Sequence, residues 1–407
     1  MSPAEIEKIR ADFPMLSARI NGKPLIYLDN AATTQKPLAV IERIRDFESG
    51  QYATVRRGSY RIGEEATEMF EDARGKVAAF IGARDRREII FTSGATQSIN
   101  LVAQSFGKKF IGPGDEIIIS NMEHHSNIVP WQTLCLEKGC ALKVVPITDS
   151  GELVMEEFEK LLGPRTKLVA VTHSSNVLGT INPVKEITRK AHAVGAMVLI
   201  DGAQGVPHKK MDVMDIDCDF LAFSGHKMYG PSGVGVLYGK YDILDAMPPY
   251  VTGGDMINTV TMERTTFAKP PARFEAGTPP ISQVIGLGAA VDYLSGAGME
   301  KIFEYETSLL EYGTRALSKI DGLRIIGAAP RKAAIISFWL DAVHPHDVVT
   351  LLDQDNIAAR GGHHCAQPLM QRFNVPATTR VSLSFYNRPE ELDMLAESLR
   401  KIIKVFG

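Results

Sequence analysis

One lysine of this chain lies where its amine could act as a nucleophile. Lys227 comes shortly after the apolar run 220–223, which predicts a buried strand. Open α/β sheets bind their ligands just beyond the carboxyl ends of such strands. Burial there would lower the pKa of the amine and free its lone pair. A lone lysine is more often a solvated surface residue, so this interpretation depends on its neighbours.

A carboxylate and an amide are expected at the same edge of the sheet. Asp201 and Gln204 follow the apolar run 197–200. A carboxylate there can pair with a protonated pyridine nitrogen, and this pairing makes the ring a better electron sink, as pyridoxal-phosphate (PLP) chemistry requires. Gln204 could donate a hydrogen bond to the hydroxyl oxygen of that ring. The structural alternative for Asp201 is a helix N-cap.

A short turn could bind the phosphate of the same cofactor. Residues 93–96, Ser-Gly-Ala-Thr, join an expected strand to an expected helix, with Ala95 and Thr96 at the start of the helix. Backbone N–H groups at a helix N-terminus favour a phosphate, and small side chains let it approach. Ser224 and His226 could add hydrogen bonds. Together these residues predict PLP, held as a Schiff base on Lys227.

Histidines and a cysteine could supply the remaining chemistry. His124, in the loop 122–127, could lie flat over a cofactor ring and shuttle protons. A metal-binding pair with His125 is the alternative, but the His-Glu-x-x-His spacing is absent, and no metal site is expected. Cys365 lies among glycines and histidines in the loop 360–366, where a thiolate would be accessible. By contrast, we expect three cysteines to be structural: Cys135, Cys140 and Cys218.

Short apolar runs alternate with helical patterns and must position these residues. Seven runs predict strands: 88–92, 116–120, 143–146, 168–172, 197–201, 220–224 and 235–238. Helices are expected between them, for example at 95–106, 128–138 and 184–194. This alternation predicts an α/β fold with a mostly parallel sheet, and the continuous apolar runs favour burial of both its faces.

The pattern changes after about residue 290 and predicts a smaller α+β unit. One long amphipathic helix is expected at 300–320, with further helices at 346–355 and 389–406. Short strands are expected at 323–326, 334–339 and 379–385. The segment 248–274 is rich in glycine, threonine and proline and predicts an exposed excursion.

Composition excludes several classes of protein. The net charge is −3 and no basic stripe is present, so neither nucleic acid nor a membrane is an expected partner. The polar, acidic N-terminus lacks a signal-peptide pattern, and no apolar run is long enough to span a bilayer. Four cysteines among 407 residues do not form a disulfide framework. A cytoplasmic enzyme is the expectation.

In their joint order along the chain, these motifs resemble the class V aminotransferase-like PLP enzymes of fold type I. Within that group they resemble the group II cysteine desulfurases of the SufS type. The motifs that carry the resemblance are residues 27–33, 122–125, 173–179, 201–204, 224–227, 273–279 and 362–365. The resemblance implies a large PLP-binding domain with a seven-stranded, mostly parallel sheet at 26–291. It also implies a smaller α+β domain formed by 1–25 and 292–407, which carries the cysteine loop and an arginine that binds the substrate.

The resemblance also implies a role for each matching residue. The cofactor would be held by Ala95, Thr96, His124, Asn176, Asp201, Gln204, Ser224, His226, Lys227 and Thr278. Of these, Thr278 is similar to a residue that reaches the phosphate of a neighbouring subunit, which implies a homodimer. Arg380 resembles the clamp for the substrate carboxylate, assisted by Asn176 and Arg360. Catalysis would fall to Lys227, His124 and Cys365.

The reaction implied is removal of sulfur from L-cysteine, giving L-alanine and a persulfide on Cys365. The sulfur would pass to an acceptor protein of the SufE or SufU type, with iron–sulfur cluster assembly as the usual purpose. A selenocysteine lyase or a CsdA-like desulfurase is the alternative. A class V aminotransferase is disfavoured because transamination needs no thiol. A non-enzymatic metal-binding or scaffold protein built on the histidines would bind zinc and no PLP.

Two segments of the chain bear on the choice of sulfur acceptor. Where the family commonly has His-Arg-Gly-x-His, this chain keeps Arg57 and replaces the two histidines with Arg56 and Tyr60; Ser59 takes the x position. The transfer of sulfur or the choice of acceptor protein could differ at this segment. The stretch 343–347 resembles desulfurases that use a zinc-bearing SufU-type acceptor, because a histidine there could ligate the metal of the acceptor. An ordinary helix-start loop is the alternative.

Overall fold

A seven-stranded sheet forms the centre of the molecule. The structure is a computed structural model and describes residues 1–20, 22–56 and 58–406. The strands run in the order β4-β10-β9-β8-β7-β5-β6, and only β10 is antiparallel to its neighbours. They are β4 (Ile89–Thr92), β5 (Glu116–Ser120), β6 (Ala141–Val145), β7 (Thr166–Thr172), β8 (Met197–Asp201), β9 (Phe220–Ser224) and β10 (Gly235–Gly239). The predicted fold class and mostly parallel sheet are confirmed.

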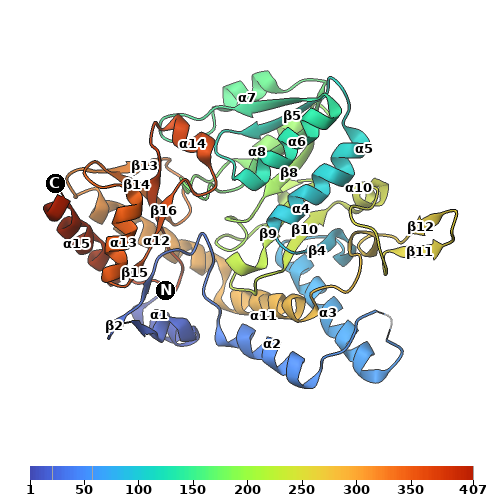
Figure 1. Cartoon of the computed structure of the whole chain (residues 1–407), viewed down its shortest axis with the longest axis horizontal. Coiled ribbons are helices and arrows are strands. Elements are labelled where there is room, and N and C mark those ends of the chain that lie inside the picture. The colour runs from blue at the N-terminus through green and yellow to red at the C-terminus, as the bar shows by residue number, and fades with distance from the viewer. Residues whose placement is uncertain (21, 57, 407) are drawn as a thin grey trace.

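Helices cover both faces of this sheet, which explains the continuous apolar runs. Alternate residues of a strand enter different cores: Ile118 packs in one, and Ile117 and Ile119 pack in the other. The first core contains side chains of α3 (Arg61–Phe80), α8 (Val184–His192) and α11 (Ile281–Ala297). The second contains side chains of α4 (Ala95–Val102) and α6 (Val129–Lys138). In Figure 1, α4 and α6 lie in front of the strands, and α3 and α11 lie below them.

One predicted helix differs from the structure in detail, and the predicted excursion contains two short strands. The helix expected at 95–106 is not a continuous α-helix. The helix α4 ends at Val102, and a π-helical turn (Ala103–Gly107) and the short helix α5 (Lys108–Phe110) follow it. The excursion at 248–274 contains an exposed hairpin formed by β11 (Ile257–Val260) and β12 (Thr265–Phe267). The hairpin extends away from the sheet at the right of Figure 1. No helix in the described part of the chain is both long and apolar enough to cross a membrane.

A second sheet lies in the C-terminal part of the chain and has its own core. Its antiparallel order is β13 (Leu323–Ile326), β14 (Ile335–Leu340), β17 (Thr378–Ser382) and β16 (Arg360–Gly362). The helices α12 (Met299–Leu317), α13 (Pro345–Gln354) and α15 (Pro389–Phe406) contribute side chains to that core. Strand β17 ends three residues before the predicted end. The short helix α14 (Gln367–Arg372) was not predicted.

The N-terminal segment contacts both cores. Phe13, after α1 (Pro3–Ala11), packs in the core of the large sheet. The strand β3 (Ile26–Tyr27) instead pairs in parallel with β15 (Ile357–Ala358), and Ile26 and Leu28 belong to the C-terminal core. The chain thus passes between the two cores near residue 26. The domain division at residues 26 and 291 stays a prediction.

Candidate active site

A cavity of about 300 Å³ lies at the carboxyl ends of the parallel strands. Its lining includes every predicted site residue except Thr278: Ala95, Thr96, His124, Asn176, Asp201, Gln204, Ser224, His226, Lys227, Arg360, Cys365 and Arg380. One wall comes from the large sheet and the opposite wall from β16, β17 and the loop after β16. A site at this edge follows from the topology, because the carboxyl ends of parallel strands meet there.

Lys227 lies at the end of β9 in a one-turn 3₁₀ helix, Gly225–Lys227. Burial lowers the pKa of its amine, and the nearby carboxylate of Asp201 opposes that shift. The two residues are close because β8 and β9 are adjacent parallel strands, with Asp201 paired to Ala222. A lowered pKa increases the fraction of neutral amine, which is the nucleophilic and basic form.

Asp201 is buried at the end of β8, and burial raises the pKa of its carboxyl group. Its Oδ1 accepts a hydrogen bond of 3.0 Å from the backbone N–H of Ala203. No helix follows directly, so the helix N-cap alternative is not what the structure shows. A cationic partner in the cavity, such as a protonated pyridine nitrogen, would favour the ionised form. Gln204 donates its side-chain N–H to the carbonyl oxygen of Ala31 (2.7 Å).

The predicted phosphate turn packs directly against β10. The hydroxyl of Ser224 accepts a hydrogen bond of 2.9 Å from the backbone N–H of Ala95. A Cβ on Gly235 would lie only 2.3 Å from the Cα of Gly94, so the approach of the turn to the sheet requires glycine. Ala95 and Thr96, the first residues of α4, therefore face the cavity beside Ser224, which suits a phosphate group.

His124 lies in the cavity as a neutral ring. Burial and the nearby charge of Lys227 lower its pKa to about 4. Its Nδ1 accepts the backbone N–H of Ser126 (3.0 Å), so the neutral tautomer carries its proton on Nε2. A neutral flat ring that can donate one proton matches the predicted role above a cofactor ring.

Two arginines on adjacent strands share one carboxylate. Arg360 on β16 lies directly opposite Arg380 on β17. Asp29 accepts hydrogen bonds from both guanidinium groups, at 3.0 Å from Arg360 Nε and 2.9 Å from Arg380 Nη2. Arg380 is buried, its Nη1 donates to the carbonyl oxygen of Asn176 (3.0 Å), and its Nε has no partner among the described residues. An unpaired buried donor suits a substrate carboxylate.

The loop that carries Cys365 is compact and held at several points. His364 and Cys365 both adopt left-handed backbone conformations, with φ of 52° and 54°. Two consecutive non-glycine residues in this region cost energy unless their surroundings fix them. The carbonyl oxygen of Cys365 accepts the N–H of His125 (2.7 Å), and Asn176 donates to the carbonyl oxygen of His364 (2.8 Å). Cys365 itself is exposed.

The other cysteines lie outside this cavity, as predicted. Cys218 is fully buried in the large core. Cys135 and Cys140 have sulfur atoms 2.9 Å apart at the end of α6. Burial raises the pKa of the Cys135 thiol to about 12. The geometry leaves Cys365 as the thiol that faces the Lys227 cavity.

Three residues of this region were not predicted from the sequence. Asp29 lies within the motif 27–33, which predicted no separate role for it. Glu123, next to His124, is fully buried, and burial raises its pKa to about 8. Lys36 donates to the carbonyl oxygens of Thr34 (2.6 Å) and His226 (2.9 Å), and burial lowers its pKa to about 8. Asp29 and Glu123 lie in the motifs 27–33 and 122–125, which offered a signal for them. Only the fold brings Lys36 to this place.

Two further predictions concern the surface. Thr278 is exposed and does not line the cavity of its own chain, so its role toward a second subunit stays a prediction. Arg56 forms an ion pair with buried Glu275, three residues before Thr278. Ser59 and Tyr60 are exposed, and Arg57 lies outside the described residues.

The histidines at 344 and 346 form an ordinary helix start. Nδ1 of His344 accepts the backbone N–H of His346 (3.3 Å) and caps α13. The structure therefore has the ordinary helix start that was the alternative interpretation of this stretch. Within the ranges that the structure describes, no cluster of three or more His, Cys, Asp or Glu side chains has the arrangement of a metal site.

Comparisons with known proteins agree with this geometry. The family model described as aminotransferase class-V matches residues 26–395. A cysteine desulfurase of Dickeya dadantii is 52% identical over 403 residues, which cover 99% of this chain and 98% of the relative. A probable cysteine desulfurase of Halalkalibacterium halodurans is 49% identical over all of this chain and 99% of its own.

Solved structures show the same relationship. The apo cysteine desulfurase of Thermococcus onnurineus NA1 has a TM-score of 0.94 and 37% identity, with 98% of each chain covered. The cysteine desulfurase CsdA of Escherichia coli, solved as its S-sulfonic acid form, has a TM-score of 0.91 and 37% identity, with 99% of each chain covered. This chain belongs to the class V aminotransferase family and, within it, to the cysteine desulfurases.

Proposed function

We propose that this chain is a group II cysteine desulfurase of the SufS type, which uses PLP and stores sulfur as a persulfide on Cys365. The observation that carries the proposal is that Cys365 lines the same cavity as Lys227, Asp201 and Arg380. An aminotransferase needs the latter three residues and has no use for a thiol at that position. A metal-binding scaffold would use none of them.

The lining of the cavity fits PLP residue by residue. Asp201 would pair with the pyridine nitrogen, His124 would cover the ring, and Lys227 would form the covalent link. Ser224, His226 and the backbone of Ala95 and Thr96 would hold the phosphate. Gln204 would reach the ring oxygen after giving up its bond to Ala31. When bound, PLP supplies an electron sink for negative charge at the α-carbon of the substrate.

Arg380 would orient the substrate. A guanidinium binds a carboxylate through two parallel hydrogen bonds, and the unpaired Nε of Arg380 supplies one donor. Asp29 and the carbonyl of Asn176 hold the other side of the same group, so the arginine cannot rotate away. Arg360 would add a second cation and Asn176 its amide at the rim.

Lys227 and Cys365 would divide the chemistry between them. The neutral amine of Lys227 would remove the α-proton, because burial disfavours its charged form. The Cys365 sulfur would then form a bond to the substrate sulfur while the bond from that sulfur to the substrate β-carbon breaks. L-Cysteine and one thiol become L-alanine and one persulfide, so no external oxidant or reductant is consumed.

The compact cysteine loop indicates how the sulfur would leave. Hydrogen bonds to His125 and Asn176 hold the backbone around Cys365, so the persulfide would stay at the mouth of the cavity. An acceptor of the SufE or SufU type would have to bring its own thiol to this point. A homodimer with Thr278 at the neighbouring site, a cytoplasmic location and iron–sulfur cluster assembly complete the proposal.

A CsdA-like desulfurase is the second candidate, with selenocysteine lyase activity as a further possibility. The similarity to the solved CsdA over nearly the whole chain favours it. The two candidates share the cavity and differ in the acceptor. A SufE-type acceptor, a SufU-type acceptor and a CsdA-type acceptor, added separately, should stimulate alanine release to different extents. Stimulation by the CsdA-type acceptor alone would favour the second candidate.

The central experiment follows sulfur on the purified holoenzyme. Incubation with L-cysteine and no reductant should add one sulfur atom to the peptide that contains Cys365, as measured by mass spectrometry. Alanine should appear as this persulfide forms; added thiol should then reduce the persulfide to sulfide and allow further turnovers that yield alanine and sulfide in equal amounts. Cys140→Ser is the matched control and should behave like the wild type. Sulfur on any other cysteine, with Cys365 unmodified, would contradict the proposal.

A further inference from the structure

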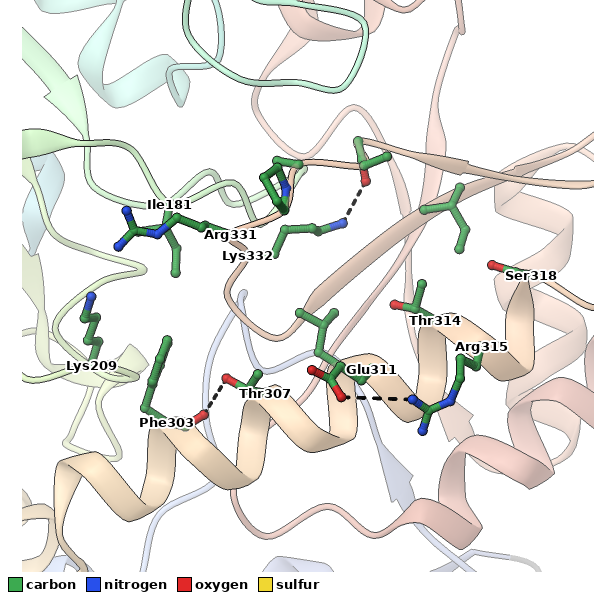
Figure 2. A pocket seen from close by; sticks show the side chains of 16 residues that line it. Ile181, Lys209, Phe303, Thr307, Glu311, Thr314, Arg315, Ser318, Arg331 and Lys332 are labelled. Atoms are coloured by element: carbon green, nitrogen blue, oxygen red, sulfur yellow. Dashed lines mark hydrogen bonds and ion pairs between the residues drawn. The ribbon is translucent and has the colours of Figure 1, made fainter.

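A second cavity, larger than the active site, lies between the large sheet and the C-terminal unit. Its volume is about 690 Å³, within the usual range of small-molecule pockets. One side is the helix α12, and the opposite side is the turn 327–332 together with Ile325 of β13. Ile181 and Lys209, from loops that follow β7 and β8, complete its lining (Figure 2).

The two ends of the cavity differ in charge. Figure 2 shows Lys209 and Arg331 at one end and Thr314, Arg315 and Ser318 at the other. Arg315 is paired with Glu311 at 4.0 Å. Among the described residues, neither Lys209 nor Arg331 has a carboxylate within 4 Å. Neither cation at this end is therefore held in an ion pair, although four carboxylates line the adjoining hollow: Glu186, Asp212, Asp215 and Asp217.

A third cation, the partly buried Lys332, lies next to this end of the cavity, whereas Arg331 itself is exposed. Lys332 lies beside Arg331, and its Nζ donates to the carbonyl oxygen of Gly327 (2.8 Å). Burial lowers the pKa of Lys332 to about 8. Burial lowers the pKa of His173, behind this end, to about 4, and the charges of Lys209 and Arg331 contribute to the same shift. The charges of the two residues thus converge on one region.

The remainder of the lining is apolar or carries hydroxyl groups. Phe303, Leu310, Ile325 and Pro330 supply apolar surface. The ammonium of Lys209 lies 5.4 Å from the centre of the Phe303 ring, so this aromatic ring forms part of the cationic end. Thr314 and Ser318 present hydroxyl groups at the far end (Figure 2). A ligand for this lining would have an anionic head and an apolar body.

We propose that this cavity binds a small organic anion, with its phosphate or carboxylate head between Lys209 and Arg331 and its apolar body along α12. An arginine fork and a lysine together suit either head, because both hold oxygen acceptors with hydrogen bonds assisted by charge. The cationic end adjoins a second hollow of about 1100 Å³ that shares Ile181, Lys209 and Arg331. That hollow provides a route of entry.

The site is separate from the proposed catalytic one. None of its lining residues lines the Lys227 cavity. The two are connected through one chain segment, because Ile181 donates its N–H to the carbonyl of Arg331 (2.9 Å) and Asn176 lies five residues earlier at the active site. Because the two cavities share no lining residue, binding here can be measured on the holoenzyme with the cofactor in place.

Three probes that share a phenyl body test the proposal: phenyl phosphate, phenylacetate and the neutral 2-phenylethanol. The reporters are the ¹³C-labelled methyl groups of Ile181 and Ile325, which line the cavity. We expect at least one anion to shift both signals with a Kd on the order of 1 mM, as suits ligands of this size. The neutral alcohol should bind at least about tenfold more weakly. A stronger effect of one anion identifies the head group.

Variants decide whether the two cations form the site. Arg331→Gln and Lys209→Gln should each weaken anion binding by about tenfold, because each removes a hydrogen bond to a charged group. Lys401→Gln is the control, since this exposed lysine lines neither the cavity nor the adjoining hollow and should bind as the wild type does. No shift at Ile181 and Ile325 with either anion would overturn the proposal, as would unchanged binding in both variants.

Discussion

The two walls of the active-site cavity are built in opposite ways. The wall that carries Lys227 and Asp201 is built at the ends of two buried strands, with Asp201 buried and Lys227 partly buried in the short turn after β9. The wall that carries Cys365 is a loop with two left-handed residues and an exposed thiol. Burial shifts pKa values and suits a cofactor, whereas exposure suits a sulfur atom that must leave the protein. The comparison indicates which wall fixes the cofactor and which delivers the product.

Removal of Lys227 tests the buried wall and has the largest expected effect. Lys227→Ala should reduce alanine formation from L-cysteine by at least about 10³-fold, because both the nucleophile and the base are lost. The visible absorbance of the linked cofactor should change as well. Lys319→Ala, at an exposed position of the C-terminal unit, is the control and should retain both signals. Wild-type turnover by Lys227→Ala would refute the assignment.

Removal of the thiol tests the exposed wall. Cys365→Ser should keep the visible spectrum of the cofactor and lose about 10²–10³-fold in alanine formation, since a hydroxyl is a poor nucleophile toward sulfur. The spectrum and the turnover would then separate the two walls. If Cys365→Ser released alanine at the wild-type rate, the persulfide would have to form elsewhere. Loss of the cofactor spectrum in this variant would show that the loop also helps to hold PLP.

Arg380 joins the two walls and should show a smaller effect. Arg380→Lys keeps the charge but removes the planar fork and the bond to Asn176, so KM for L-cysteine should rise about 10–100-fold. Steady-state kinetics with the exposed control Arg324→Lys gives the comparison. The spectrum of the bound cofactor should not change. An unaltered KM would mean that the substrate carboxylate binds to another group.

The two walls also differ in how far their sequences predict them. The runs 116–120, 197–201 and 220–224 matched their strands to the residue, because burial of both faces makes the central residues of each run apolar. The side chains at their carboxyl ends could therefore be placed at one edge of the sheet. The functions assigned to these side chains stay predictions, since geometry brings residues together without demonstrating their roles.

The exposed wall was predicted less completely, for physical reasons. Left-handed backbone at His364 and Cys365 has no local sequence signal, because neither residue is glycine and the conformation depends on contacts from His125 and Asn176. The carboxylate of Asp29 reaches Arg380 across more than three hundred residues of chain. Pairings of this kind depend on tertiary structure. They leave no periodicity for sequence analysis to detect.

Glu123 offers the smallest and most specific test of the buried wall. Its carboxyl accepts the N–H of Thr172 (3.1 Å) and the side-chain N–H of Asn127 (2.7 Å), yet burial still raises its pKa from the usual 4.5 to about 8. The folded state therefore holds a proton that the unfolded state releases. By linkage, stability falls as pH rises from about 4.5 to about 8, by at most ~5 kcal/mol in total.

Glu123→Gln removes this titration and should flatten the pH dependence. The amide cannot accept every bond that the carboxylate accepts, so some stability is lost at all pH values. The informative quantity is thus the difference in unfolding free energy between variant and wild type, measured by denaturant titration near pH 5.5 and near pH 8.5. That difference should shift in favour of the variant at the higher pH. Parallel pH profiles would show that Glu123 is already ionised in the folded protein, and that the buried wall tolerates a charge beside His124.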